Sequence, residues 1–262
     1  MALIDIGANL AHDSFDDDRD SVIARAAEAG VTRFVVTGSD LASSQGAIDI
    51  ARAHPGRGFA TAGLHPHHAS DWSDELAGLM RRAAAAGEIV AIGETGLDYF
   101  RDISPRDVQM RVFAAQLAIA VEHDMPVFLH QRDAHADFIA ILREYLPHLP
   151  RAVVHCFTDG PDVLADYLAA DLHVGITGWI CDERRGADLY AAAADIPDDR
   201  LMIETDCPYL MPRTIRPKPK SRRNEPAYLP WVRDSVATAR GVAPDHIERI
   251  TTANAARFFA LA

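Results

Sequence analysis

The sequence predicts a single (β/α)₈ barrel, a fold in which eight parallel strands alternate with eight helices. Three observations support this prediction. Eight short apolar runs alternate with longer amphipathic stretches, the 262 residues suit one barrel of this kind, and polar side chains collect where the apolar runs end. A doubly wound open sheet uses the same alternation and is the alternative.

The expected strands are short apolar runs, each followed by a polar or glycine-containing turn. In chain order they are 3–7 (LIDIG), 33–38 (RFVVTG), 58–63 (GFATAG), 89–93 (IVAIG), 126–130 (PVFLH), 152–157 (AVVHCF), 172–177 (LHVGIT) and 201–206 (LMIETD). Helices such as 20–30, 107–124 and 186–195 are expected between them, because apolar residues recur there at three- and four-residue spacing. The Pro- and Arg-rich stretch 212–226 predicts a long loop after the eighth strand. With no repeat or linker evident, residues 1–262 are expected to form one domain.

Composition bounds the class of protein. The chain is 48% hydrophobic and 24% charged, which is typical of a soluble globular protein. A net charge of −12 argues against a nucleic-acid coat protein, but it leaves room for an enzyme with a local basic patch. Three cysteines without CxxC spacing predict no disulfide framework and favour the cytoplasm. We expect neither a signal peptide nor a membrane span.

Metal-competent residues stand at the ends of several expected strands. His65 follows the third strand, Glu94 the fourth, His130 the fifth, His155 the sixth, and Asp206 the eighth. In a barrel these ends form one rim, so residues far apart in sequence can meet there. Carboxylate and imidazole together can hold a divalent cation and leave positions open for water.

The hypothesis is therefore that Glu94 holds a metal ion, with His130 and His155 beside it. Taken singly, a histidine at a strand end is more often structural, and a glutamate there can be a helix N-terminal charge. Asp206 has two possible roles. It can complete the metal shell, or it can accept a proton from water as the general base.

Substrate contacts are expected from the basic residues after the eighth strand. This densest basic cluster of the chain comprises Arg213, Arg216, Lys218, Lys220, Arg222 and Arg223. Its place next to the strand of Asp206 favours phosphate contacts, although a charged loop that only aids solubility is the simpler interpretation. Tyr99 and Trp179 follow strands of the same rim, and each could stack on bases or pack inside the protein.

Six ordered motifs resemble the TatD family of metal-dependent deoxyribonucleases over essentially the whole chain. They are "AGLHPHH", "AIGETGLDY", "PVFLHQRDA", "VVHCFTDG", "IETDCPYL" and "RRNEPAYLP". Each motif is weak alone, but the ordered set is specific. "DIGANL", "GITGWICDERRG" and "PKPKSRRNEP" bring the chain closest to the branch that gives the family its name.

The resemblance implies a TIM-like barrel of the metal-dependent hydrolase type, related to the amidohydrolases. It implies a nuclease that removes nucleotides from the ends of single-stranded DNA, from 3′ to 5′, with RNA as a further substrate. DNA repair or degradation is the process that the resemblance suggests. By resemblance, Glu94, His130 and His155 are metal ligands, Asp206 is a ligand or base, and His65 faces the reacting phosphate. Mg²⁺ is the expected cation, while the two histidine ligands leave Mn²⁺ and Zn²⁺ open.

One motif departs from the family pattern. Most members open with D-x-H-x-H-L, whose two histidines bind a second metal, whereas this chain has Asp5, Gly7 and Asn9. We therefore expect one tightly bound ion. Asn9 is expected either to donate a hydrogen bond near the substrate phosphate or to cap the turn after the first strand. An amidohydrolase or esterase of small molecules, and a catalytically weak binding protein, are the alternative functions. A monomer is favoured.

Overall fold

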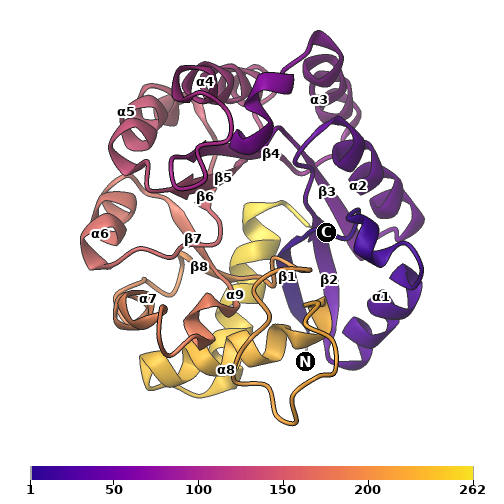
Figure 1. Cartoon of the computed structure of the whole chain (residues 1–262), viewed down its shortest axis with the longest axis vertical. Coiled ribbons are helices and arrows are strands. Elements are labelled where there is room, and N and C mark those ends of the chain that lie inside the picture. The colour runs from indigo at the N-terminus through magenta and orange to yellow at the C-terminus, as the bar shows by residue number, and fades with distance from the viewer. Residues whose placement is uncertain (1, 262) are drawn as a thin grey trace. The chain divides into compact units, whose positions relative to one another are not determined.

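The computed structural model describes residues 2–261, in which strands and helices alternate along the chain (Figure 1). Each of the eight predicted runs overlaps a strand within these residues. The strands are β1 (Leu3–Ala8), β2 (Val31–Val36), β3 (Gly58–Ala62), β4 (Ala91–Asp98), β5 (Val127–Arg132), β6 (Ala152–Val154), β7 (His173–Ile176) and β8 (Leu201–Ile203). The α-helices are α1 (Arg19–Glu28), α2 (Leu41–Ala53), α3 (Asp74–Ala86), α4 (Arg106–Glu122), α5 (His135–Tyr145), α6 (Pro161–Ala169), α7 (Ala187–Ala192), α8 (Leu229–Arg240) and α9 (Pro244–Phe258).

The chain divides into two compact units. The first unit contains the residues up to 35, residues 156–169 and the residues from 173 onward. The second unit contains residues 36–155 and 170–172. None of the helices between residues 2 and 261 combines the length and the apolar character that crossing a bilayer requires.

In the first unit, the start and the end of the strand series lie side by side. The Asp206 N–H donates to the Gly7 carbonyl at 2.8 Å, and the Asn9 N–H donates to the Cys207 carbonyl at 3.0 Å. Ala8 and Cys207 form a parallel bridge, and α8 and α9 pack on both β1 and β8. The first and last strands are neighbours in a barrel but stand apart in an open doubly wound sheet, so this pairing favours the predicted barrel.

In the second unit, β3, β4, β5 and β6 pair in parallel and in chain order. Helices α4 and α5 lie on the outer side of these strands (Figure 1), where Phe113 stacks on Phe138 with ring centroids 5.3 Å apart. Parallel pairing brings the carboxyl ends of β4, β5 and β6 to one edge, which places their side chains within reach of one another.

Strand β4 differs from the prediction at its carboxyl end, around Glu94. The sequence suggested that the strand ends before Glu94, but β4 continues to Asp98, and its pairing with β5 is irregular between Ile92 and Thr95. Gly93 has φ +141°, and a Cβ there would lie 2.2 Å from the Phe128 carbonyl oxygen. Only glycine fits this close approach, so the irregularity depends on Gly93.

The long loop predicted after β8 is confirmed, since residues 212–225 contain neither helix nor strand. The expectation of one domain over residues 1–262 stays a prediction beside the two units described above.

Candidate metal centre and active site

Glu94 is aimed by the irregular stretch of β4. Its backbone N–H leaves the β4–β5 ladder and donates to the Gly38 carbonyl at 2.7 Å. A bulge of this kind turns a side chain away from the regular alternation of the strand. The Glu94 residue is 6% exposed, so its carboxylate must find polar partners inside the protein.

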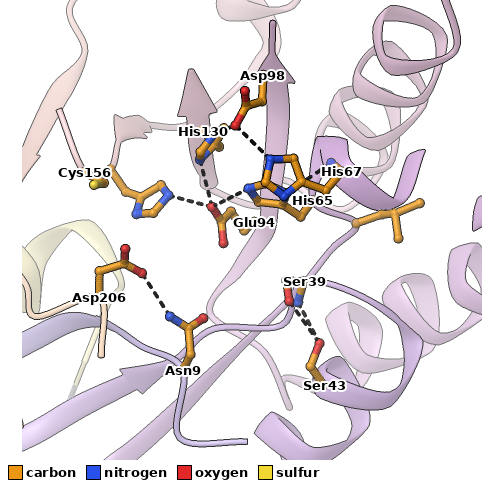
Figure 2. Close-up of polar contacts among 12 residues, drawn as sticks. Asn9, Ser39, Ser43, His65, His67, Glu94, Asp98, His130, Cys156 and Asp206 are labelled. Atoms are coloured by element: carbon orange, nitrogen blue, oxygen red, sulfur yellow. Dashed lines mark hydrogen bonds and ion pairs between the residues drawn. The ribbon is translucent and has the colours of Figure 1, made fainter. Parts of the chain in front are cut away.

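Three imidazoles of the second unit supply those partners and converge on one oxygen, Glu94 Oε1. His155 Nε2 lies 2.7 Å from it, His130 Nδ1 3.1 Å and His65 Nε2 3.4 Å. Figure 2 shows the labelled members pointing toward one another from separate elements. One ligand atom each from His65, Glu94 and His130 lie within 4.8 Å of one another, a spacing that could hold a metal ion. The predicted metal ligands are Glu94, His130 and His155, with Asp206 as ligand or base, and this assignment stays a prediction.

Glu94 is ionised in this cluster, as a cation site requires. Burial alone would raise the pKa of Glu94, but the charge of His155 and hydrogen bonds from His130 and His155 outweigh it and hold the pKa well below its ordinary value. Burial holds the pKa of His65 well below its ordinary value, against the opposing charge of Glu94. An ionised Glu94 and a neutral His65 can therefore coexist in this buried site at neutral pH.

Asp98 selects the tautomer of His130. Its Oδ2 lies 3.3 Å from His130 Nε2 and 2.9 Å from His67 Nε2, and its Oδ1 accepts the Arg101 N–H at 2.7 Å. Burial alone would raise the pKa of Asp98, but these hydrogen bonds outweigh it and lower the pKa, so Asp98 only accepts. Burial lowers the pKa of His130, but hydrogen bonds to Asp98 and Glu94 outweigh it and raise the pKa, so without a metal both ring nitrogens can donate. When His130 is neutral, the proton stays on Nε2 and Nδ1 offers its lone pair beside Glu94.

His65 has the opposite arrangement. Its Nδ1 accepts the backbone N–H of His67 at 3.1 Å, so a neutral His65 carries its proton on Nε2, the nitrogen that faces Glu94. An N–H in this position is a hydrogen-bond donor and cannot be a metal ligand in the same tautomer. The hydrogen bonds thus favour His65 as a donor beside the metal site.

Sequence reasoning missed Asp98 altogether and gave His67 no role. A usable signal existed, because Asp98 lies four residues after Glu94 in the same apolar stretch, and residues separated by an even number in a strand share a face. The apparent end of the strand at Gly93 concealed it.

Asp206 and Asn9 belong to the first unit and contact each other. Asn9 Nδ2 donates to Asp206 Oδ1 at 2.9 Å, as the dashed line in Figure 2 marks. Asp206 has φ +53°, and its N–H is bonded to the Gly7 carbonyl, so its backbone is fixed where β1 and β8 lie together. Asn9 therefore orients the carboxylate of Asp206, a contact that its sequence position alone did not reveal.

The two arginines predicted to bind substrate are in different environments. Arg223 donates from both terminal nitrogens to Asp18 at 2.8 Å, bonds the Ser14 carbonyl and lies over the Phe15 ring. Arg222 is exposed, and no ion pair or hydrogen bond holds its side chain within residues 2–261. Both assignments stay predictions, but Arg222 is the one whose charge is available.

Comparisons with known proteins identify the family of this chain. A family model described as TatD related DNase matches residues 4–260. Proteins named 3′-5′ ssDNA/RNA exonuclease TatD from Erwinia billingiae (strain Eb661) and Dickeya dadantii (strain 3937) are 51% and 50% identical to this chain. The first comparison covers 99% of both chains, and the second covers 98% of this chain and 97% of the relative.

Solved structures show the same architecture. A hydrolase of the TatD family from Entamoeba histolytica has a TM-score of 0.89 at 24% identity, covering 99% of this chain and 98% of the other. The phosphotriesterase homology protein from Escherichia coli, solved with phosphate in its active site, has a TM-score of 0.68 at 18% identity and covers 98% of each chain. The fold is that of the barrel hydrolases, which confirms the predicted fold class. Within that class, the chain belongs to the TatD family, as its motifs indicated.

Proposed function

We propose that this chain is a metal-dependent exonuclease that removes nucleotides from the 3′ ends of single-stranded DNA and also acts on RNA. The observation that carries the proposal is the convergence of three imidazoles on one ionised oxygen of Glu94, in a chain of the TatD family. Relatives about half identical to it over their full length are named for this activity.

The donor set fits a divalent cation. Glu94 is ionised, and in neutral His130 the Nδ1 lone pair points at the same place as the Glu94 oxygen. We assign Glu94, His130 and His155 as the ligands of one tightly bound ion. Mg²⁺ is the proposed ion, and Mn²⁺ or Zn²⁺ suits the imidazole donors at least as well.

A divalent cation supplies the charge that polarises the scissile phosphate and acidifies water. Asp206 accepts the proton of the attacking water as general base, or serves as a further ligand. Asn9 Nδ2 holds Asp206 Oδ1 at 2.9 Å and so fixes the direction of its lone pairs. His65 donates from Nε2 to the oxygen on which negative charge develops.

The substrate is held by local charge, because the whole chain carries −12. Arg222 contributes an unengaged cation from the loop that follows Asp206, and phosphate contacts of this kind hold a strand without reading its bases. The proposal includes a monomeric enzyme of the cytoplasm. None of Cys156, Cys181 and Cys207 is in a disulfide, which suits a reducing compartment.

The test uses single- and double-stranded oligonucleotides labelled at either end, incubated with Mg²⁺, Mn²⁺ or EDTA. The expected result is stepwise loss of nucleotides from the 3′ end of single strands, stopped by EDTA. A parallel panel of amide and carboxylic ester substrates covers the alternative hydrolases. Turnover of that panel without phosphodiester cleavage would overturn the proposal, as would no metal-dependent turnover of any substrate.

A further inference from the structure

Phe100 is an exposed aromatic residue two positions after the end of β4. It is 54% exposed, and the guanidinium carbon of Arg132 lies 3.8 Å from the centroid of its ring. A single exposed apolar residue is common on protein surfaces and needs no explanation by itself. Here, however, a cation covers one face of the ring and holds it in place, while more than half of the residue stays open to solvent.

The position of this pair links it to the metal centre. Phe100 comes two residues after Asp98, and Arg132 comes two residues after His130 on β5. Strand β5 carries His130 and Arg132 on the same face, with Arg132 about 7 Å further toward the carboxyl end. The β4–β5 register pairs Asp98 with Arg132 directly. The stacked pair therefore follows the residues of the Glu94 cluster on the same two strands, at the carboxyl ends of β4 and β5.

The neighbouring Tyr99 also lies beneath an arginine, but both its hydroxyl and that arginine have partners within the protein. Its hydroxyl donates to Asp137 at 2.8 Å, and the cation over its ring, Arg106, is paired with Asp102 at 3.1 Å. Arg132 differs, because no carboxylate pairs with it in the part of the chain from residue 2 to residue 261. Its charge is thus available to a phosphate beside the ring.

We propose that Phe100, backed by Arg132, is a stacking site for an unpaired nucleobase at the 3′ end of the substrate, with Arg132 attracting the adjoining phosphate. This inference deepens the proposed nuclease function and rests on it. Every base has a face that can stack on an aromatic ring, so the site accepts all four bases. A base held in a duplex is already stacked and paired, so the same site favours single strands.

Binding tests the stacking directly. The probe is a single-stranded oligonucleotide with the fluorescent base 2-aminopurine in either of its last two 3′ positions, titrated with the full-length protein in EDTA so that no cleavage occurs. Stacking should quench the fluorescence with wild type and with Phe100→Trp, and the quenching should be lost with Phe100→Ala. Ile103→Ala is the matched control, because Ile103 is an exposed apolar residue of the same loop at 63% exposure.

Kinetics give a second readout. For an ordinary single strand, Phe100→Ala should raise KM about tenfold, since stacking on one aromatic residue is worth roughly 1.4 kcal/mol. For the same strand with abasic sites in its last two positions, wild type and Phe100→Ala should have equal KM. Quenching that survives in Phe100→Ala, or an equal rise in KM on the abasic strand, would overturn the stacking site. If wild type quenches but cleaves nothing with any metal, the stacking site stands and the proposed nuclease function fails.

Discussion

Asp98 and His67 form a layer of contacts behind the ligands, and this layer decides how His130 faces Glu94. A carboxylate that accepts from His130 Nε2 fixes the proton there and leaves Nδ1 for a metal. Without it, the imidazole could adopt the other tautomer and turn an N–H toward the ion. The proposed ligand set therefore depends on a residue that is not itself one of the proposed ligands.

The first prediction concerns Asp98→Asn. An amide can donate toward His130 and no longer selects its tautomer, so affinity for Mn²⁺ should fall about 10- to 100-fold. Titration calorimetry with Mn²⁺ on metal-free protein measures this without any turnover. Asp102→Asn is the matched control from the loop after β4, because Asp102 pairs with Arg106 and its substitution should leave the affinity unchanged. Equal Mn²⁺ affinity in wild type and Asp98→Asn would show that Asp98 is only structural.

The second prediction concerns Asn9→Ala. Asn9 holds Asp206 through one hydrogen bond at 2.9 Å, so its loss should lower kcat about tenfold while the tightly bound metal stays in place. Metal analysis of the purified variant and steady-state kinetics on a single-stranded oligonucleotide give the two readouts. If Asn9 only caps the turn after β1, thermal stability should fall instead and kcat should stay near the wild-type value. A second ion bound as tightly as the first, without substrate, would contradict the single-metal assignment.

In the loop after β8, one arginine is held by contacts with the rest of the protein and the arginine before it is exposed to solvent. Arg223 is bonded to Asp18 through both terminal nitrogens and lies over Phe15, while Arg222 beside it has no such contacts within residues 2–261. The sequence grouped the two arginines as substrate-binding. The structure indicates that one of them stabilises the loop.

The third prediction separates these two roles. Arg222→Ala should raise KM for DNA and flatten its salt dependence, because fewer counterions are released on binding. Arg223→Ala should leave the salt slope unchanged and lower the free energy of unfolding by about 1 kcal/mol, as expected for a partly exposed ion pair. The measurements are KM at several salt concentrations and urea unfolding of each variant. A salt slope that changes only in Arg223→Ala would reverse the assignment.

Asp5 joins β1 to the segment after β8 and makes this junction sensitive to pH. It is fully buried and accepts from the Thr205 N–H at 2.9 Å, the Thr205 hydroxyl at 2.5 Å and the Gly7 N–H at 3.2 Å. Burial outweighs these hydrogen bonds and raises the pKa of Asp5 to about 7. In the unfolded chain the same group titrates near pH 4.

The fourth prediction follows from that difference. Between about pH 4 and pH 7, the folded state keeps a proton on Asp5 that the unfolded state has lost, so the contribution of Asp5 to stability falls as pH rises through this window. Asp5→Asn keeps an acceptor oxygen but cannot ionise, and its urea midpoint should depend less on pH across the same range. Asp17→Asn, at an exposed site, is the control. Parallel midpoint curves for wild type and Asp5→Asn would contradict the assigned pKa.

For the molecule as a whole, the sequence was sufficient wherever regular alternation decided the outcome. Eight apolar runs predicted the strands. The polar residues at the carboxyl ends of these runs predicted that Glu94, His130 and His155 would meet. The sequence was insufficient where a single backbone feature set the end of a strand, or where a distant residue supplied the partner of a side chain. The positive φ of Gly93 lets β4 continue to Asp98, and Arg223 finds a partner about two hundred residues away in Asp18. Neither the length of β4 nor the pairing of Arg223 with Asp18 depends on hydrophobic periodicity, so a periodic pattern in the sequence could not reveal them.

The two compact units raise the question of whether the chain unfolds as one domain. Their boundaries do not resemble domain linkers, because the division at residues 35 and 36 falls inside β2, and the chain passes between the units four times. Separate domains are usually joined by exposed, flexible segments that few contacts cross. We therefore expect the whole chain to unfold in one cooperative transition.

The last prediction tests that expectation with the metal as a probe. The proposed ligands Glu94, His130 and His155 all lie in the second unit, so Mn²⁺ bound to them should stabilise that unit directly. At a concentration of Mn²⁺ 100 times its Kd, binding to the folded state adds about 2.7 kcal/mol, which corresponds to a rise in Tm of roughly 5–10 °C. If the chain is one domain, calorimetry should show one transition that moves as a whole, and Glu94→Ala should abolish the shift. A transition that splits on addition of Mn²⁺, with one part unmoved, would show that the units unfold independently.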